Sequence, residues 1–178
     1  MATFKQFRER HESTSVGYFD NWAIDDSVEI LDAWKSVQFR DLHRLATFED
    51  VLTENELRRY SVFAARQVQH LVKDEASRNA LDVAEKFSEG QATADELAAA
   101  KHASESAPWG NCDAATAAES ACAPVSSVWS ACRAISAARS AIKGKDARVA
   151  FENCLTQWLR ENTKPQFDNP PRVGQAQS

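Results

Sequence analysis

The sequence predicts an all-α protein: a compact multi-helix bundle of antiparallel helical hairpins, with short N-terminal helices and a flexible C-terminal tail. Three observations lead to this fold class. Apolar residues recur at three- and four-residue steps, legible capping signals separate these segments, and about a third of residues 92–150 are alanine. Alanine has the highest intrinsic helix propensity, so this composition favours closely packed helices.

The central segment predicts three consecutive core helices over about residues 54–106. The first should begin with a capping box formed by Thr53 and Glu56, and it carries an apolar stripe at helical spacing. Its stripe comprises Leu57, Tyr60 or Ser61, Ala64, Val68, Leu71 and Val72. Short connections between the three helices predict antiparallel neighbours.

Three further signals mark the boundaries of the second and third core helices. Asp74 is placed to cap the second helix, and Gly90 can end it in a left-handed conformation. Thr93 and Glu96 repeat the capping-box pattern at the start of the third helix.

Shorter helices should precede this core, and alanine-rich ones should follow it. Short helices are predicted over residues 3–12, 28–37 and after Asp41. Alanine-rich helices are predicted over about 112–161, interrupted by prolines and by Gly144. In this part, one apolar face is expected to hold Val128, Trp129, Cys132, Ile135 and Ile142, and another Val149, Phe151, Leu155, Trp158 and Leu159. The prediction is a single domain over residues 1–161 and a disordered tail over 162–178.

Composition narrows the classes of function. The chain has 178 residues, 26% charged residues and a formal net charge of −5, which argues against a general nucleic-acid binder. No apolar run reaches the roughly 20 residues that span a bilayer, and the N-terminus has no apolar signal region. A protein kept in the cytoplasm, without membrane contact, is therefore expected.

The sequence offers no motif for a catalytic, cofactor or metal site, so a non-enzyme is predicted. Glycine-rich phosphate loops, a nucleophile elbow and His-Glu-x-x-His are all missing from the sequence. The cysteines lie too far apart for a typical zinc site, and packing on helical faces is the preferred interpretation, with a metal site or disulfide as the alternative. These cysteines are Cys112, Cys122, Cys132 and Cys154.

One stretch resembles a known family. Phe63-Ala64-Ala65-Arg66, the segment from Asp74 to Ala80, and Glu85, Gly90 and Glu96-Leu97 with the alanines that follow are similar to the alanine-rich, all-helical immunity-protein family. That family occurs in bacterial toxin-immunity loci and in phage genomes. The resemblance covers about residues 28–107, including a Trp-containing segment ahead of the core helix. The chain departs from the family pattern in two places. Its core helix has Phe63-Ala64-Ala65 where relatives often carry cysteines, and its third quarter is interrupted by prolines.

The resemblance implies a protein that binds and blocks a partner protein, either a toxin or a component of bacterial defence. An anti-CRISPR-like, phage-encoded inhibitor acting in the host cytoplasm is one form of this hypothesis. Aromatic residues dominate binding hot spots, so the candidate partner-binding residues are aromatic side chains and their acidic neighbours. They are Tyr18, Asp20, Trp22, Asp25, Asp26 and Trp109.

Two alternatives remain open at the level of sequence. A ligand-binding or catalytic bundle would have a pocket near Tyr60, Arg66 and His70, because helical bundles build sites from facing side chains. A homo-oligomeric scaffold is the other, since small-residue helix faces also suit self-association.

Overall fold

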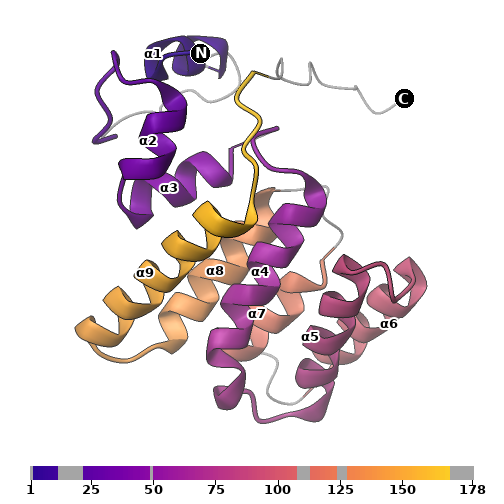
Figure 1. The fold of residues 1–178 in the computed structure, drawn as a ribbon. Coiled ribbons are helices and arrows are strands. Elements are labelled where there is room, and N and C mark those ends of the chain that lie inside the picture. Colours follow the sequence, from indigo (N-terminus) through magenta and orange to yellow (C-terminus); the bar gives the residue numbers. More distant parts are fainter. Residues whose placement is uncertain (1, 12–21, 49, 108–112, 124–127, 169–178) are drawn as a thin grey trace. The chain divides into compact units, whose positions relative to one another are not determined.

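The all-α prediction is confirmed by a computed structural model, which describes residues 2–11, 22–48, 50–107, 113–123 and 128–168. Within these ranges the chain forms nine α-helices and a short 3₁₀ helix, and its one β-type pairing is an isolated antiparallel bridge between Thr3 and Glu29 (Figure 1).

The helices belong to two compact units, where the sequence predicts a single domain. One unit, which we call the terminal unit, combines Met1–Thr53 with Thr156–Ser178. The other, the central unit, is the uninterrupted segment Glu54–Leu155.

The central unit is built around α4 (Glu54–Val68), which packs against α5 (Glu75–Ser88), α7 (Asp113–Ala121) and α8 (Val128–Ala141). A 3₁₀ turn, η2 (Gln69–Leu71), ends α4, and α5 pairs with α6 (Ala94–Glu105) as a hairpin. The unit also contains the start of α9 (Lys145–Asn162).

The boundaries of α5 and α6 confirm the capping signals in the sequence. Asp74 accepts a hydrogen bond from the Ser77 amide at 2.6 Å, and Thr93 and Glu96 form a reciprocal capping box. Gly90 follows α5 with φ +74°, a conformation that a Cβ would strain. The capping hydrogen bonds join residues three positions apart, so the starts of α5 and α6 are determined by the local sequence.

The core of the central unit depends on alanines and on a buried arginine. Arg58 of α4 is 5% exposed, and its Nη1 donates hydrogen bonds to the carbonyl oxygens of Ala121 and Ala123. Its guanidinium carbon also lies 4.8 Å from the centre of the Phe87 ring. Arg58 therefore caps the C-terminal end of α7, whose unpaired carbonyls favour a cation.

The buried face of α8 differs from the prediction. Ala131, Ala134, Ile135 and Ala138 face the core at helical spacing, whereas Trp129 is 81% exposed. Trp129 precedes Ile135 by six residues, which turns it about 120° away on a helix. The prediction that Trp129 lies on the buried face of α8 is therefore wrong. The prediction that Val149 of α9 is buried is also wrong, because this residue is 45% exposed.

The terminal unit contains α1 (Phe4–His11), α2 (Ile30–Ser36) and α3 (Phe39–Ala46). The amide of Phe4 donates to the carbonyl of Val28, and that of Ile30 donates to Ala2. These bonds attach the start of α1 to the chain segment that leads into α2.

An aromatic cluster forms the core of the terminal unit. The Phe7 ring lies 5.2 Å from Phe48 and 5.7 Å from Phe167, and Phe167 lies 5.8 Å from Trp34. Arg160, near the end of α9, donates to the carbonyls of Trp34 and Val37 and so caps α2.

The segment after α9 is ordered further than the sequence predicts. Phe167 is 5% exposed, its carbonyl accepts from Arg10 at 2.8 Å, and the Gln166 amide donates to Val51. The predicted tail from residue 162 therefore starts at least six residues too early, because the Phe167 ring is buried against Phe7 and Trp34. Residues 169–178 lie outside the described part of the chain.

Candidate functional site

Trp22 lies against the terminal unit. It is half-buried, 5.3 Å from the Phe4 ring, and the Arg44 guanidinium carbon lies 5.7 Å from its ring centre. The next residue, Ala23, donates its amide to the buried carboxylate of Asp41 at 3.3 Å. Trp22 therefore contributes to packing on α1 and α3, and only part of its surface faces solvent.

Asp25 and Asp26 form the turn between this tryptophan and α2. Asp25 accepts from both the amide and the hydroxyl of Ser27, and these bonds lower the pKa of its carboxyl. Asp26 forms an ion pair with Arg8 of α1 at 3.0 Å. Both carboxylates thus have local structural partners. The other predicted partner-binding residues, Tyr18, Asp20 and Trp109, lie outside the described residues.

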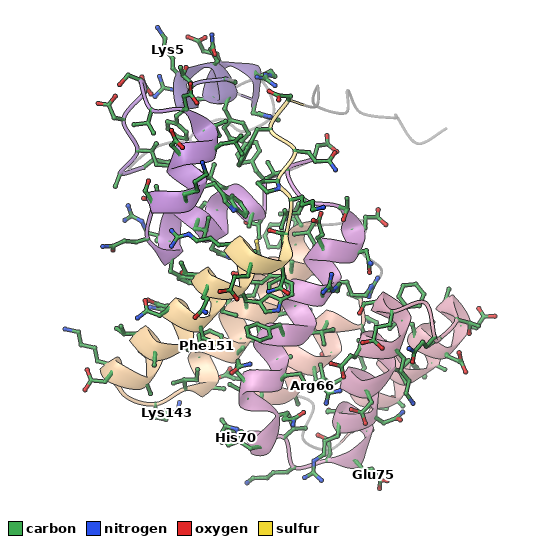
Figure 2. All side chains as sticks on the ribbon, viewed as in Figure 1. Lys5, Arg66, His70, Glu75, Lys143 and Phe151 are labelled. Carbon is green, nitrogen blue, oxygen red and sulfur yellow. The ribbon has the colours of Figure 1, made fainter. Side chains whose placement is uncertain are left out.

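Tyr60, Arg66 and His70 have different surroundings, unlike the shared pocket expected for a ligand-binding bundle. Tyr60 has no exposed surface, and burial raises the pKa of its hydroxyl well above the ordinary value. Arg66 forms ion pairs with Asp82 and Glu85 and so joins α4 to α5, whereas His70 lies exposed in η2 (Figure 2). Tyr60 and His70 are separated by ten residues, about 15 Å along a helix.

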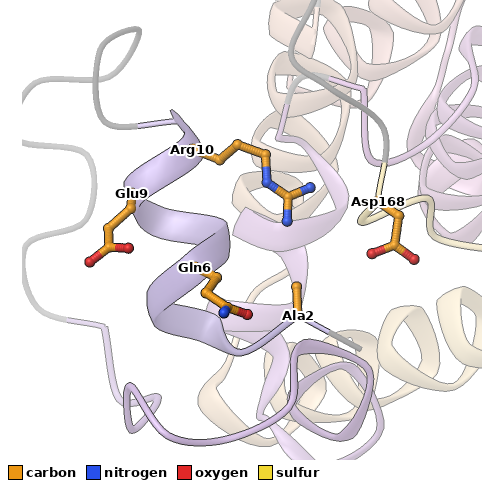
Figure 3. A pocket seen from close by; sticks show the side chains of 5 residues that line it. All are labelled: Ala2, Gln6, Glu9, Arg10 and Asp168. Atoms are coloured by element: carbon orange, nitrogen blue, oxygen red, sulfur yellow. The ribbon is translucent and has the colours of Figure 1, made fainter.

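Two hollows lie on the described surface. One, of about 800 Å³, opens widely to solvent beside α1 and is lined by Ala2, Gln6, Glu9, Arg10 and Asp168 (Figure 3). The second, of about 420 Å³, lies along the α5–α6 hairpin between Val83, Lys86, Glu96 and the alanines of α6. Both are shallow and mixed in charge, unlike the enclosed apolar clefts typical of small-molecule sites.

The described cysteines are free thiols. Cys122 is buried and donates to the carbonyl of Ala80 at 2.8 Å, and burial raises its pKa to about 12 despite the neighbouring Arg58. A thiol with so high a pKa is a poor nucleophile. Among the described residues, no group of three or more His, Cys, Asp or Glu side chains is arranged to hold a metal, and no helix could span a membrane.

Trp129 is an exposed aromatic side chain that the sequence pattern assigns to the core. It stands in the first turn of α8 with 81% of its surface exposed, although tryptophan is highly buried on average. The sequence did contain a signal: on a helical wheel centred on Ile135, Trp129 falls outside the apolar arc. Leu71 in η2, at 39%, and Val149 in α9 are the other large apolar side chains exposed in the described part of the chain.

Comparisons with known proteins give no match: no family model, no curated protein and no solved structure is similar enough to this chain to assign it to a family.

Proposed function

We propose that this chain is a non-enzymatic protein that binds one partner protein and blocks or modulates it. The observation that carries the proposal is the exposed indole of Trp129 on the ordered helix α8. Tryptophan is enriched in binding hot spots because its large ring offers much contact area at a small cost in conformational entropy. When a partner protein covers an indole that is exposed to this degree, the burial of its apolar surface stabilises the complex.

The architecture supports the same function. Helical faces display side chains at fixed spacing, and the buried cap of Arg58 on α7 together with the Arg66 ion pairs stiffens the central unit. A rigid surface loses little entropy on binding, so it suits a blocking protein.

In its narrower form, the proposal is an immunity-type protein that neutralises a toxin, or a phage-encoded inhibitor of a bacterial defence system, acting in the bacterial cytoplasm. This form rests on the resemblance of residues 28–107 to the immunity-protein family.

A pull-down with quantitative mass spectrometry tests the proposal. Tagged wild-type chain is expressed in bacteria beside the Trp129→Ala variant and a matched control, Leu71→Ala, which removes an exposed apolar side chain elsewhere in the central unit. We expect one stoichiometric partner that is retained by Leu71→Ala and depleted about tenfold or more by Trp129→Ala, in line with hot-spot substitutions. A chain that elutes alone in size-exclusion chromatography and retains no stoichiometric protein contradicts the proposal.

A further inference from the structure

We propose that one face of α8 docks an acidic segment of the partner protein, an inference that rests on the proposed function. The face consists of Trp129, Arg133, Ser136 and Ser140, and we call it the α8 ridge. These residues follow one another at steps of four, three and four, so they lie along one side of the helix, and all four are exposed. The opposite side of α8 holds the buried Ala131, Ala134, Ile135 and Ala138.

Charge identifies the kind of occupant. From Val128 to Lys145 the chain carries four cationic side chains and no carboxylate, although the whole chain has a net charge of −5. Lys143 and Lys145 are exposed at the turn that joins α8 to α9, where Figure 2 labels Lys143. The four cations are Arg133, Arg139, Lys143 and Lys145. Carboxylates of neighbouring helices lie against two of these cations, Glu119 against Arg133 and Glu152 against Arg139. Lys143 and Lys145 therefore supply most of the long-range attraction for an acidic segment, and the exposed Arg133 orients it.

Arg133 is the cation of the ridge that can accept a new partner. Its side chain is 60% exposed, and its Nη2 lies 3.6 Å from Glu119, a distance longer than a normal hydrogen bond. Arg139, by contrast, donates to Glu152 at 2.6 Å and is already engaged with α9. A carboxylate from a partner can therefore form a bidentate pair with Arg133, the geometry that guanidinium groups favour.

The sizes of the side chains along the α8 ridge suit the binding of an extended or helical protein segment. Trp129 and Arg133 are large, whereas Ser136 and Ser140 are small and allow a second backbone to approach closely. The four residues span about 16 Å, or three helical turns. An apolar residue of the partner would cover the indole, and a carboxylate about one turn further along would meet Arg133. A nucleic acid is the competing occupant of a basic aromatic surface, but the acidic chain repels phosphate at longer range.

Site-specific photocrosslinking tests the inference. Full-length chain with Trp129→p-benzoylphenylalanine is irradiated in the bacterial cell, and the crosslinked segment is identified by mass spectrometry. We expect a peptide of one partner protein that contains at least two carboxylates within about two helical turns of the crosslink. A neutral or basic peptide, a second copy of this chain, a nucleic acid, or no crosslink overturns the inference.

Charge reversal separates this inference from the proposed function. Arg133→Glu should weaken binding of the crosslinked partner about tenfold or more, and added salt should reduce the difference between wild type and variant. Lys73→Glu, which makes the same change in net charge at an exposed position before α5, is the control and should bind as wild type. If the pull-down recovers a partner and Arg133→Glu binds it unchanged, the acidic-segment inference fails while the protein-binding function stands. If no partner is recovered, the function itself fails.

Discussion

The Nη1 of Arg58 donates to the carbonyl oxygen of Ala121, the last residue of α7, at 3.1 Å, and this bond joins two residues that are 63 positions apart in sequence. Arg58 is 5% exposed, and burial lowers the pKa of its guanidinium from the ordinary arginine value. Removing it leaves buried carbonyls without a donor.

Arg58→Met should therefore lower the free energy of unfolding by about 2–4 kcal/mol, because charged hydrogen bonds are lost and acceptors remain buried. Urea denaturation followed by far-UV circular dichroism measures the change. The neighbouring exposed residue offers a control, and Arg59→Ala should change stability by less than about 0.5 kcal/mol. Equal effects of the two substitutions would contradict the capping role of Arg58.

The N-cap of α5 gives a smaller and more local prediction. Asp74→Ala should lower the free energy of unfolding by about 1 kcal/mol, because the Ser77 amide loses its acceptor. Asp74→Asn keeps an acceptor oxygen and should retain most of the stability. Chemical denaturation of both variants provides the comparison, and identical losses would show that charge, and not the hydrogen bond, is what matters at this position.

Phe167 yields a test of the aromatic cluster. Phe167→Ala should destabilise the protein by about 3–5 kcal/mol, since it empties a buried site between Phe7 and Trp34. Phe167→Leu refills most of the volume and should cost less. Thermal unfolding gives the stability, and near-UV circular dichroism reports the environment of Trp34. A Phe167→Ala protein as stable as wild type would mean that this residue does not belong to the core.

Acid should weaken the fold before the carboxylates titrate. Burial and then the neighbouring Arg44 lower the pKa of His43 to about 4, and the His43 ring stacks on Phe39. Between the unfolded value of 6.5 and about 4, the unfolded chain binds a proton that the folded chain excludes, so stability is full above pH 6.5 and falls as the pH drops. We expect a loss of about 1–2 kcal/mol between pH 7 and pH 5, an amount that allows for the partial exposure of the ring.

His43→Gln should remove most of this pH dependence. A smaller fall should remain, because burial also lowers the pKa of His11. His102→Gln, at an exposed position of α6, is the matched control and should keep the wild-type profile. Urea denaturation at several pH values measures the slope, and a His43→Gln profile that overlays wild type would exclude His43 as its source.

The sequence predicts what depends on near neighbours. The caps formed by Asp74 and by Thr93 with Glu96 join residues three apart, so their pattern is visible without a fold. Alanine content and helical periodicity likewise predict the fold class. The buried position of Phe167 depends instead on contacts with Phe7 and Trp34, which are more than 130 residues away in sequence. The local sequence around Phe167, which contains prolines, does not predict its burial.

In the candidate site, too, the sequence does not predict interactions between residues that are far apart in the chain. Residue type alone suggests Trp22 and Asp26 for partner binding, and the structure gives these two residues partners in α1 and α3 that no local pattern specifies. Trp129 was assigned to the core because it is apolar, yet small alanines define the buried side of α8. The side of α8 that faces the core carries Ala131, Ala134, Ile135 and Ala138, and Trp129 lies outside that arc. The position of a residue on the helix, as well as its polarity, therefore decides whether it faces inward.

The terminal unit combines two segments that are separated in sequence by the whole central unit, and this separation affects the order in which the two units can fold during synthesis. Residues up to Thr53 are synthesised before the central unit, and the segment from Thr156 that completes their unit is synthesised after it. The central unit, an uninterrupted stretch of sequence, can fold while synthesis continues. Phe7 and Trp34 therefore remain without their contact to Phe167 until that residue has been synthesised.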